Sequence, residues 1–101
     1  MAKVSAVKKN EKRIKLSDRL FKKRLALKKI IMDKKISLDE RFKAQQKLSN
    51  LPRNSAKNRV MNRGQINGRP HGVYRKLKIS RKALRDLGLH GLIPGMTKSS
   101  W

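Results

Sequence analysis

Residues 64–83 read GQINGRPHGVYRKLKISRKA. Two close pairs of positions in this stretch, Gly64/Asn67 and Ser80/Ala83, are separated by twelve residues, which is the spacing of a four-ligand zinc site. The chain has no cysteine, so a thiolate metal site is excluded. The stretch is therefore either a metal knuckle without its metal or a basic loop whose spacing is accidental.

A helix is expected to begin at the end of this stretch and to cover about residues 80–90. Ser80 is a favourable N-cap, and Ile79 can pack on Leu84 as a hydrophobic staple. Gly88 or Gly91 ends the helix, because glycine readily takes the left-handed conformation found after a helix. Before the helix, residues 73–79 read as a short strand or turn.

The residues before the stretch form a long basic loop. Asn, Ser, Gly, Arg and Pro dominate residues 51–72, so loop or extended chain is expected there. Arginine and lysine recur along it at intervals of two to six residues, and small polar residues between them allow a backbone to approach phosphates closely. Seven of the twelve basic residues in 51–101 are arginine, against four of seventeen in 1–50. Since the planar guanidinium bonds phosphate oxygens in pairs, the second half is the better candidate for positioned contacts.

The first half, residues 1–50, reads as two helices. In the first, an apolar face is expected from Leu16, Leu20, Leu27 and Ile31, widened by Phe21 and Leu25. Lysine and arginine cover the remaining positions.

The second helix is expected to begin with a capping box, in which Ser37 is the N-cap and Glu40 reaches back to its amide. Its apolar residues are Leu38, Phe42 and Leu48, and it ends near residue 50 because the residue before a proline disfavours helix. The short link at residues 33–36 predicts a helical hairpin.

The net charge of the chain limits the functions that it can have. The chain carries 29 Lys and Arg against 6 Asp and Glu, a formal charge of +23, so a polyanionic partner is the natural explanation. Only four residues are aromatic, and parts of the chain are expected to become ordered on that partner. The start has no apolar h-region and no apolar run approaches ~20 residues, so neither a secretory signal nor a membrane span is indicated.

Other function classes fit less well. His71 and His90 stand apart from any catalytic or metal-binding arrangement of acids, so an enzyme such as a small basic nuclease is disfavoured. A membrane-active peptide is disfavoured because the apolar stripe is narrow. The main alternative is a basic nucleoid-type DNA-binding protein, although no helix-turn-helix, basic zipper or zinc finger is evident.

Several motifs resemble one known family. LPRNS at 51–55, NGRPHGVYRK at 67–76, ISRKALRDL at 79–87 and GLIPGMTKSSW at 91–101 look like the S-fourteen family of small-subunit ribosomal proteins, over essentially the whole length. The short version of that family holds zinc between two CxxC pairs. Those ligand positions correspond here to Gly64, Asn67, Ser80 and Ala83, so the chain resembles the long, zinc-free bacterial or organellar version, and no cofactor is expected.

The resemblance implies a mainly α fold with extended loops. It comprises a helical hairpin-like extension (domain 1–50) and an rRNA-binding module (domain 51–101), with a long basic loop, a zinc-ribbon-like knuckle without metal, a short helix near 80–90 and a C-terminal tail. Departures from the family pattern fall at His71, Lys82 and Gly88.

The resemblance also implies partners and a place. The partners are rRNA of the head of the small subunit (its 3′ major domain) and the third, tenth and nineteenth small-subunit proteins, with no membrane partner and no homo-oligomer. A cytoplasmic ribosome is expected, with a mitochondrial ribosome as the alternative. Trp101 is either a plug on the last helix or a stacking residue. The candidate rRNA-binding residues are Arg53, Asn54, Ser55, Arg59, Arg63, Arg69, Tyr74, Arg75, Lys76, Arg81, Arg85, Lys98 and Trp101.

Overall fold

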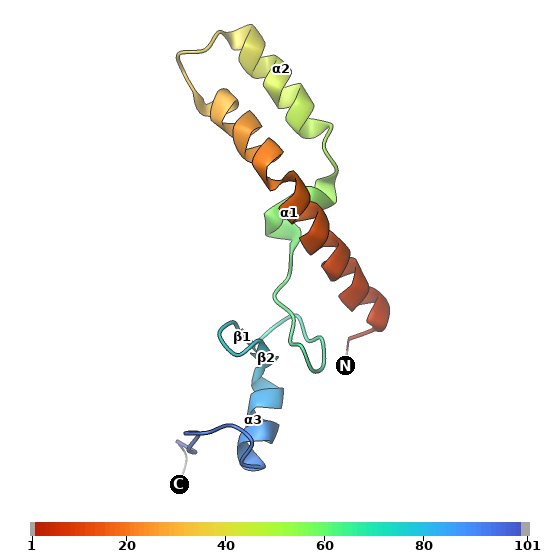
Figure 1. Ribbon diagram of the computed structural model, residues 1–101, viewed down its shortest axis with the longest axis vertical. Coiled ribbons are helices and arrows are strands. Elements are labelled where there is room, and N and C mark those ends of the chain that lie inside the picture. The colour runs from red at the N-terminus through yellow and green to blue at the C-terminus, as the bar shows by residue number, and fades with distance from the viewer. Residues whose placement is uncertain (1, 100–101) are drawn as a thin grey trace. The chain divides into compact units, whose positions relative to one another are not determined.

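The computed structural model describes residues 2–99 and is mainly helical, as predicted, with a small two-stranded sheet (Figure 1). Its helices are α1 (Val4–Met32), α2 (Leu38–Ser49) and α3 (Arg81–Leu89). The chain divides into two compact units: unit 1 is Met1–Val7 with Met61–Trp101, and unit 2 is Lys8–Val60. The predicted boundary at residue 50 separates a helical extension from an rRNA-binding module. It is a division by function and not by contacts within the chain, and it stays a prediction. Across residues 2–99, every helix is too short or too polar to cross a bilayer.

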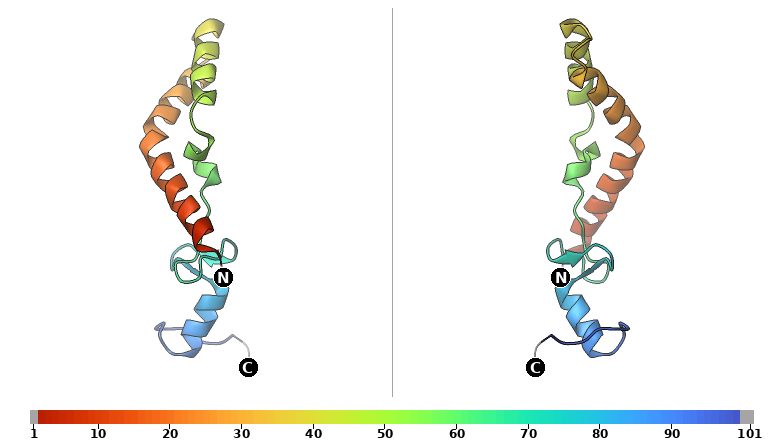
Figure 2. Two further views of the ribbon diagram at one scale, coloured as in Figure 1. Left: turned by 90° about the vertical axis from the view of Figure 1, so that its right-hand side faces the viewer. Right: turned by 90° about the vertical axis from the view of Figure 1, so that its left-hand side faces the viewer.

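Unit 2 is a helical hairpin. α2 lies alongside the second half of α1 and runs in the opposite direction (Figures 1 and 2). α1 contains no glycine or proline over its 29 residues, which favours a long uninterrupted helix. Leu20 is buried, and Leu16, Leu27 and Ile31 are half-buried, so this part of the expected inward face of α1 is confirmed. The predicted widening of that face is wrong, because Phe21 and Leu25 are 47% and 43% exposed.

Of the three apolar residues predicted to face inward from α2, Leu48 is half-buried, but the prediction is wrong for Leu38 and Phe42. Leu38 and Phe42 are 78% and 62% exposed, whereas Ala44 is only 5% exposed. Arg41, Ala44 and Leu48 share the buried stripe at helical spacing, and residues 38 and 42 fall on another face of the helix.

The ends of the hairpin are stabilised differently from the prediction. Ser37 does occupy the N-cap position of α2, but its side chain makes no cap hydrogen bond, so the predicted capping box is absent. Arg41 Nε instead donates to the carbonyl oxygen of Ile31 at 2.9 Å. That carbonyl is one of the last four of α1, which lack partners within the helix. The arginine therefore links the end of one helix to the start of the other.

The segment after α2 is not simply extended. It folds into two 3₁₀ turns, η1 (Arg53–Ser55) and η2 (Lys57–Arg59). Ser55 is 1% exposed, its hydroxyl accepts a hydrogen bond from Arg24 Nε at 2.8 Å, and it donates to the Pro52 carbonyl. The first turn is thus anchored on α1.

Unit 1 contains the two-stranded antiparallel sheet and α3. In it β1 (Val73–Tyr74) pairs with β2 (Ile79–Ser80), Val73 lying opposite Ser80. The strand at 73–74 was expected; β2 was not. Ser80 caps α3 as predicted, because its Oγ accepts from the amide of Ala83 at 3.3 Å.

Gly91, rather than Gly88, ends α3. Its φ is +70°, and its amide donates to the carbonyl of Gly88 at 3.1 Å. The amide of Leu92 donates to the carbonyl of Leu87 at 3.0 Å. This pair of bonds is a Schellman motif, which requires a left-handed residue at that position.

Candidate nucleic-acid interface

The four positions with zinc-site spacing lie together in unit 1. Asn67 Nδ2 donates to Ser80 Oγ at 3.1 Å, and the same hydroxyl caps α3 through the amide of Ala83. A Cβ placed on Gly64 would lie 3.0 Å from Asn67 Oδ1 and 3.2 Å from the backbone nitrogen of Ser80. Ser80 is fully buried. We call residues 64–69 with residues 78–83 the knuckle.

The knuckle residues do not fit a zinc ion. Gly64 and Ala83 bring no donor atom, and protein zinc ligands are thiolates, imidazoles and carboxylates rather than the amide of Asn67 or the hydroxyl of Ser80. The two polar side chains are already bonded to each other. The space beside Gly64 is occupied by the Asn67 side chain.

Arg63, the residue directly before the knuckle, forms a hydrogen bond to its turn. Its Nη1 donates to the carbonyl of Gly68 at 2.9 Å. Its Nε is buried and has no hydrogen-bond partner among residues 2–99. A buried guanidinium nitrogen without an acceptor is costly.

A groove lined entirely by basic side chains lies at the start of α3. We call it the cationic groove; its volume is about 370 Å³ and its lining residues are Arg69, Arg81, Lys82 and Arg85. Residues 81, 82 and 85 are brought to one side by the helical repeat, and Arg69 comes from the knuckle. Like charges gathered on one concave surface attract a multivalent anion.

A second groove adjoins it on α3 and contains an aromatic residue. We call it the tyrosine groove; its volume is about 350 Å³. Tyr74 comes from β1, and Met96 packs over Gly88, since a Cβ on that glycine would lie 3.8 Å from Met96 Cε. The full lining is Tyr74, Arg81, Leu84, Arg85, Gly88, Leu89, Met96, Thr97, Lys98 and Ser99.

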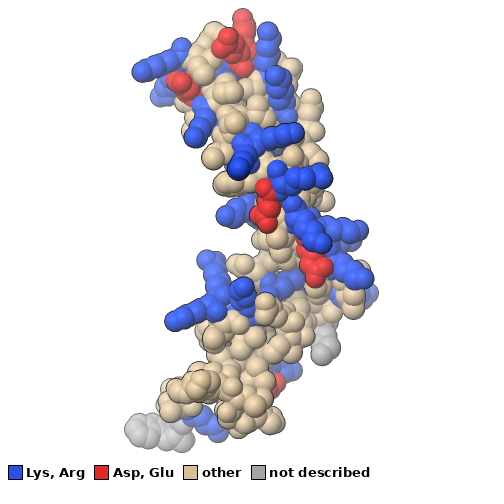
Figure 3. Space-filling view, viewed as in Figure 1, with Lys and Arg blue, Asp and Glu red and all other residues tan. Residues whose placement is uncertain are grey.

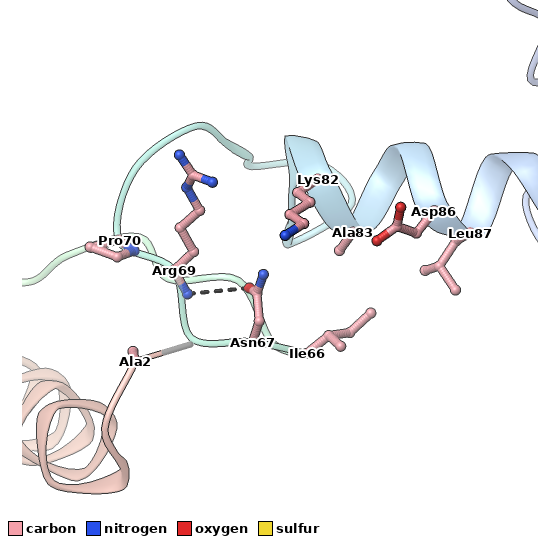
Figure 4. Close-up of a pocket in the computed structure, with 9 residues that line it drawn as sticks. All are labelled: Ala2, Ile66, Asn67, Arg69, Pro70, Lys82, Ala83, Asp86 and Leu87. Carbon is pink, nitrogen blue, oxygen red and sulfur yellow. Dashed lines mark hydrogen bonds between the residues drawn. The ribbon is translucent and has the colours of Figure 1, made fainter.

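The opposite face of α3 borders a third, larger pocket, of about 590 Å³. Figure 4 shows Ala83, Asp86 and Leu87 of α3 on one side of it and the knuckle, with Ile66 and Asn67, on the other. Lys82 and Arg69 line both this larger pocket and the cationic groove. Asp86, the only acid in residues 51–101, lies on this side and not in the two basic grooves.

The structure places the predicted rRNA-binding residues in several settings. Arg69, Tyr74, Arg81, Arg85 and Lys98 come together around α3 in the two grooves. Arg75 and Lys76 are exposed in the turn between the strands. Sequence reasoning missed Lys82; its place in the cationic groove beside Arg81 and Arg85 follows from the helical repeat after a Ser80 cap.

Unit 2 holds the remaining candidates. Arg53 is exposed, and Arg59 Nη1 donates to Asn54 Oδ1 at 3.1 Å, which holds the two 3₁₀ turns together. Ser55 is buried against Arg24, so its side chain serves the fold in this structure. Trp101 lies outside the described residues.

The charge on the visible face is mostly basic. Figure 3 shows Lys and Arg side chains over both units, with several acids gathered at the end of unit 2 that holds the α1–α2 turn. Asp33, Asp39 and Glu40 belong to that part of the sequence. Within residues 2–99, no group of three or more His, Cys, Asp or Glu side chains is placed to hold a metal ion.

Comparison with known proteins decides the family. The family described as ribosomal protein S14p/S29e matches residues 47–100. A Pelagibacter ubique protein, "Small ribosomal subunit protein uS14", is 92% identical over 101 residues, all of both chains. The chain belongs to the uS14 family of ribosomal proteins. Proteins of the same name from Chelativorans sp. and Mesorhizobium japonicum are 59% and 60% identical over the full length of both chains. The uS14 family is one of structural ribosomal components, not enzymes, as the sequence predicted.

Proposed function

We propose that this uS14-family chain binds rRNA in the head of the small ribosomal subunit and helps to hold that RNA in its folded arrangement. The observation that carries this proposal is the gathering of Arg69, Tyr74, Arg81, Arg85 and Lys98, all predicted from the sequence, around one short helix. The family membership supports the ribosomal setting.

The mechanism is electrostatic attraction followed by positioned contacts. Each lysine or arginine placed on a phosphate releases condensed counterions, so binding is strong and falls steeply with salt. Guanidinium groups fixed by the fold then select RNA of matching shape. Arg63 contributes indirectly, because its Nη1 donates to the carbonyl of Gly68 and so supports the turn that presents Arg69.

The knuckle is proposed to be held by hydrogen bonds in place of a metal. The Asn67–Ser80 bond and the cap on Ala83 join the two segments that zinc would join in the short version of the family. The zinc-ribbon-like description of the fold and the functional division at residue 50 belong to the same proposal.

The proposed partners are those that the family resemblance implies: rRNA of the 3′ major domain and the third, tenth and nineteenth small-subunit proteins. A cytoplasmic ribosome is proposed, in keeping with the bacterial relatives. The mitochondrial alternative has no support among the relatives named above.

The test is equilibrium binding of the full chain to small-subunit rRNA and to duplex DNA of equal length, over a range of salt. The double variant Arg81→Gln/Arg85→Gln should lower the slope of log K against log salt by roughly 0.7–0.9 per lost phosphate contact. The double variant Lys43→Gln/Lys47→Gln, at two exposed residues of α2, removes the same number of charges and is the control for loss of charge alone. Equal affinity for DNA and rRNA at every salt concentration would favour the nucleoid alternative instead.

A further inference from the structure

We infer that the tyrosine groove receives one unpaired nucleobase while the cationic groove holds the adjoining phosphate. The inference rests on the proposed function and names the kind of RNA element that this site takes: a single-stranded nucleotide rather than a duplex.

The two grooves are adjacent because they share side chains. Arg81 and Arg85 line both. They lie one helical turn apart on the same side of α3. A nucleotide that crosses this pair would have its phosphate among four basic groups and its base in the neighbouring groove.

The chemistry of the tyrosine groove suits a base. Tyr74 is 50% exposed, so its ring is accessible, and Met96 is 44% exposed. Leu84 and Leu89 add apolar walls, while Thr97 and Ser99 bring hydroxyls that can bond to a base edge. Its volume of about 350 Å³ falls within the ~300–1,000 Å³ typical of small-molecule sites. Stacking of a base on an aromatic side chain contributes ~1–3 kcal/mol.

The arrangement disfavours a duplex. Bases in a regular RNA helix are stacked on one another and cannot enter a side-chain groove, whereas bases in loops and bulges can be splayed out. The other face of α3 is a poor alternative, since the pocket there contains the Asp86 carboxylate, which repels phosphate. The basic side chains on one face of α3 and the Asp86 carboxylate on the other thus favour binding of the nucleotide on the face that carries the tyrosine groove.

Methyl NMR of the full chain with labelled methionine tests the inference. The probes are a single-stranded RNA pentanucleotide, an abasic oligomer with the same number of phosphates, and an RNA duplex. The Met96 methyl should shift upfield with the single strand, through the ring current of a stacked base, and not with the abasic oligomer or the duplex. Met32, 78% exposed in unit 2, is the internal reference.

Variants separate stacking from charge. Tyr74→Leu should weaken binding of the pentanucleotide by about 5- to 150-fold, the factor equivalent to ~1–3 kcal/mol per stacked base, and leave abasic binding unchanged. Tyr74→Phe should retain single-strand binding, and Leu77→Ala, in the same turn but outside both grooves, should have no effect.

The outcomes distinguish this inference from the proposed function. Equal affinity for abasic and base-containing strands, with a stationary Met96 methyl, overturns the base site even where salt-dependent binding to rRNA persists. Loss of all preference for small-subunit rRNA would refute the proposed function itself. A Met96 shift produced equally by the duplex would also overturn the inference.

Discussion

Asn67 and Ser80, thirteen residues apart, are joined by a 3.1 Å hydrogen bond from Nδ2 to Oγ. The bond connects the turn of the knuckle to the first residue before α3, at a serine that is fully buried. Asn67 Oδ1 also accepts from the amide of Arg69 at 3.3 Å, so one side chain orients both an arginine of the cationic groove and the helix that carries the others.

Asn67→Ala should therefore destabilise the knuckle by about 1–3 kcal/mol, because it leaves the buried Ser80 hydroxyl with one partner fewer. Hydrogen exchange of the amides in residues 64–83 measures this. Gln65→Ala, an exposed residue of the same turn, should leave exchange unchanged. Equal protection in the two variants would show that the bond does not hold the knuckle.

A second prediction concerns Gly68. Its φ is +68°, and a Cβ there would lie 2.8 Å from Val7 Cγ2, closer than carbon atoms can approach without movement. Gly91 has a similar φ of +70° but nothing within 4 Å of the added atom. Both alanine variants incur the cost of a left-handed residue, ~1–2 kcal/mol. Gly68→Ala should lower the thermal unfolding midpoint of the full chain further than Gly91→Ala, and equal shifts would contradict the close contact.

The third prediction tests the anchor of η1. Ser55→Ala removes the acceptor for Arg24 Nε and should increase hydrogen exchange or proteolytic cleavage in residues 52–60, at a cost of about 1–3 kcal/mol. Lys23→Ala, exposed on α1 beside Arg24, is the matched control. If Ser55→Ala leaves this segment fully protected but weakens rRNA binding, the serine acts on RNA directly and the structural explanation fails.

Metal removal gives a fourth prediction. Because the knuckle is proposed to be closed by hydrogen bonds, a chelator should leave the unfolding midpoint of the full chain unchanged. Elemental analysis should find no stoichiometric zinc. A chelator-induced loss of helicity would contradict a metal-free knuckle, since structural zinc sites contribute directly to folding.

Local signals were sufficient for part of this structure. The cap at Ser80, the helix that follows and its end at a glycine depend on neighbouring residues, and the inward leucines of α1 follow from a 3.6-residue repeat. Leu38 and Phe42 fit an apolar pattern equally well, yet they are exposed. Which face of α2 is buried depends on what surrounds it in space, and the apolar pattern of α2 alone does not contain that information.

The long-range contacts could not be read from the sequence. Arg24 and Ser55 are 31 residues apart, and a basic residue in a lysine-rich helix gives no sign that it will anchor a distant turn. Lys82 looked like a departure from the family pattern, but the helical repeat places it in the cationic groove. The candidate arginines of unit 1 were predictable by type; their arrangement in two grooves required the fold.

The most direct test of the central claim is co-sedimentation of the full chain with ribosomal particles from cells that produce it. Lysates are fractionated after a high-salt wash that removes loosely bound basic proteins. The chain is predicted to remain with the small subunits in about one copy each, and Arg81→Gln/Arg85→Gln should be released at lower salt than Lys43→Gln/Lys47→Gln. Recovery of the wild-type chain with DNA, and its absence from the washed small subunits, would contradict the account.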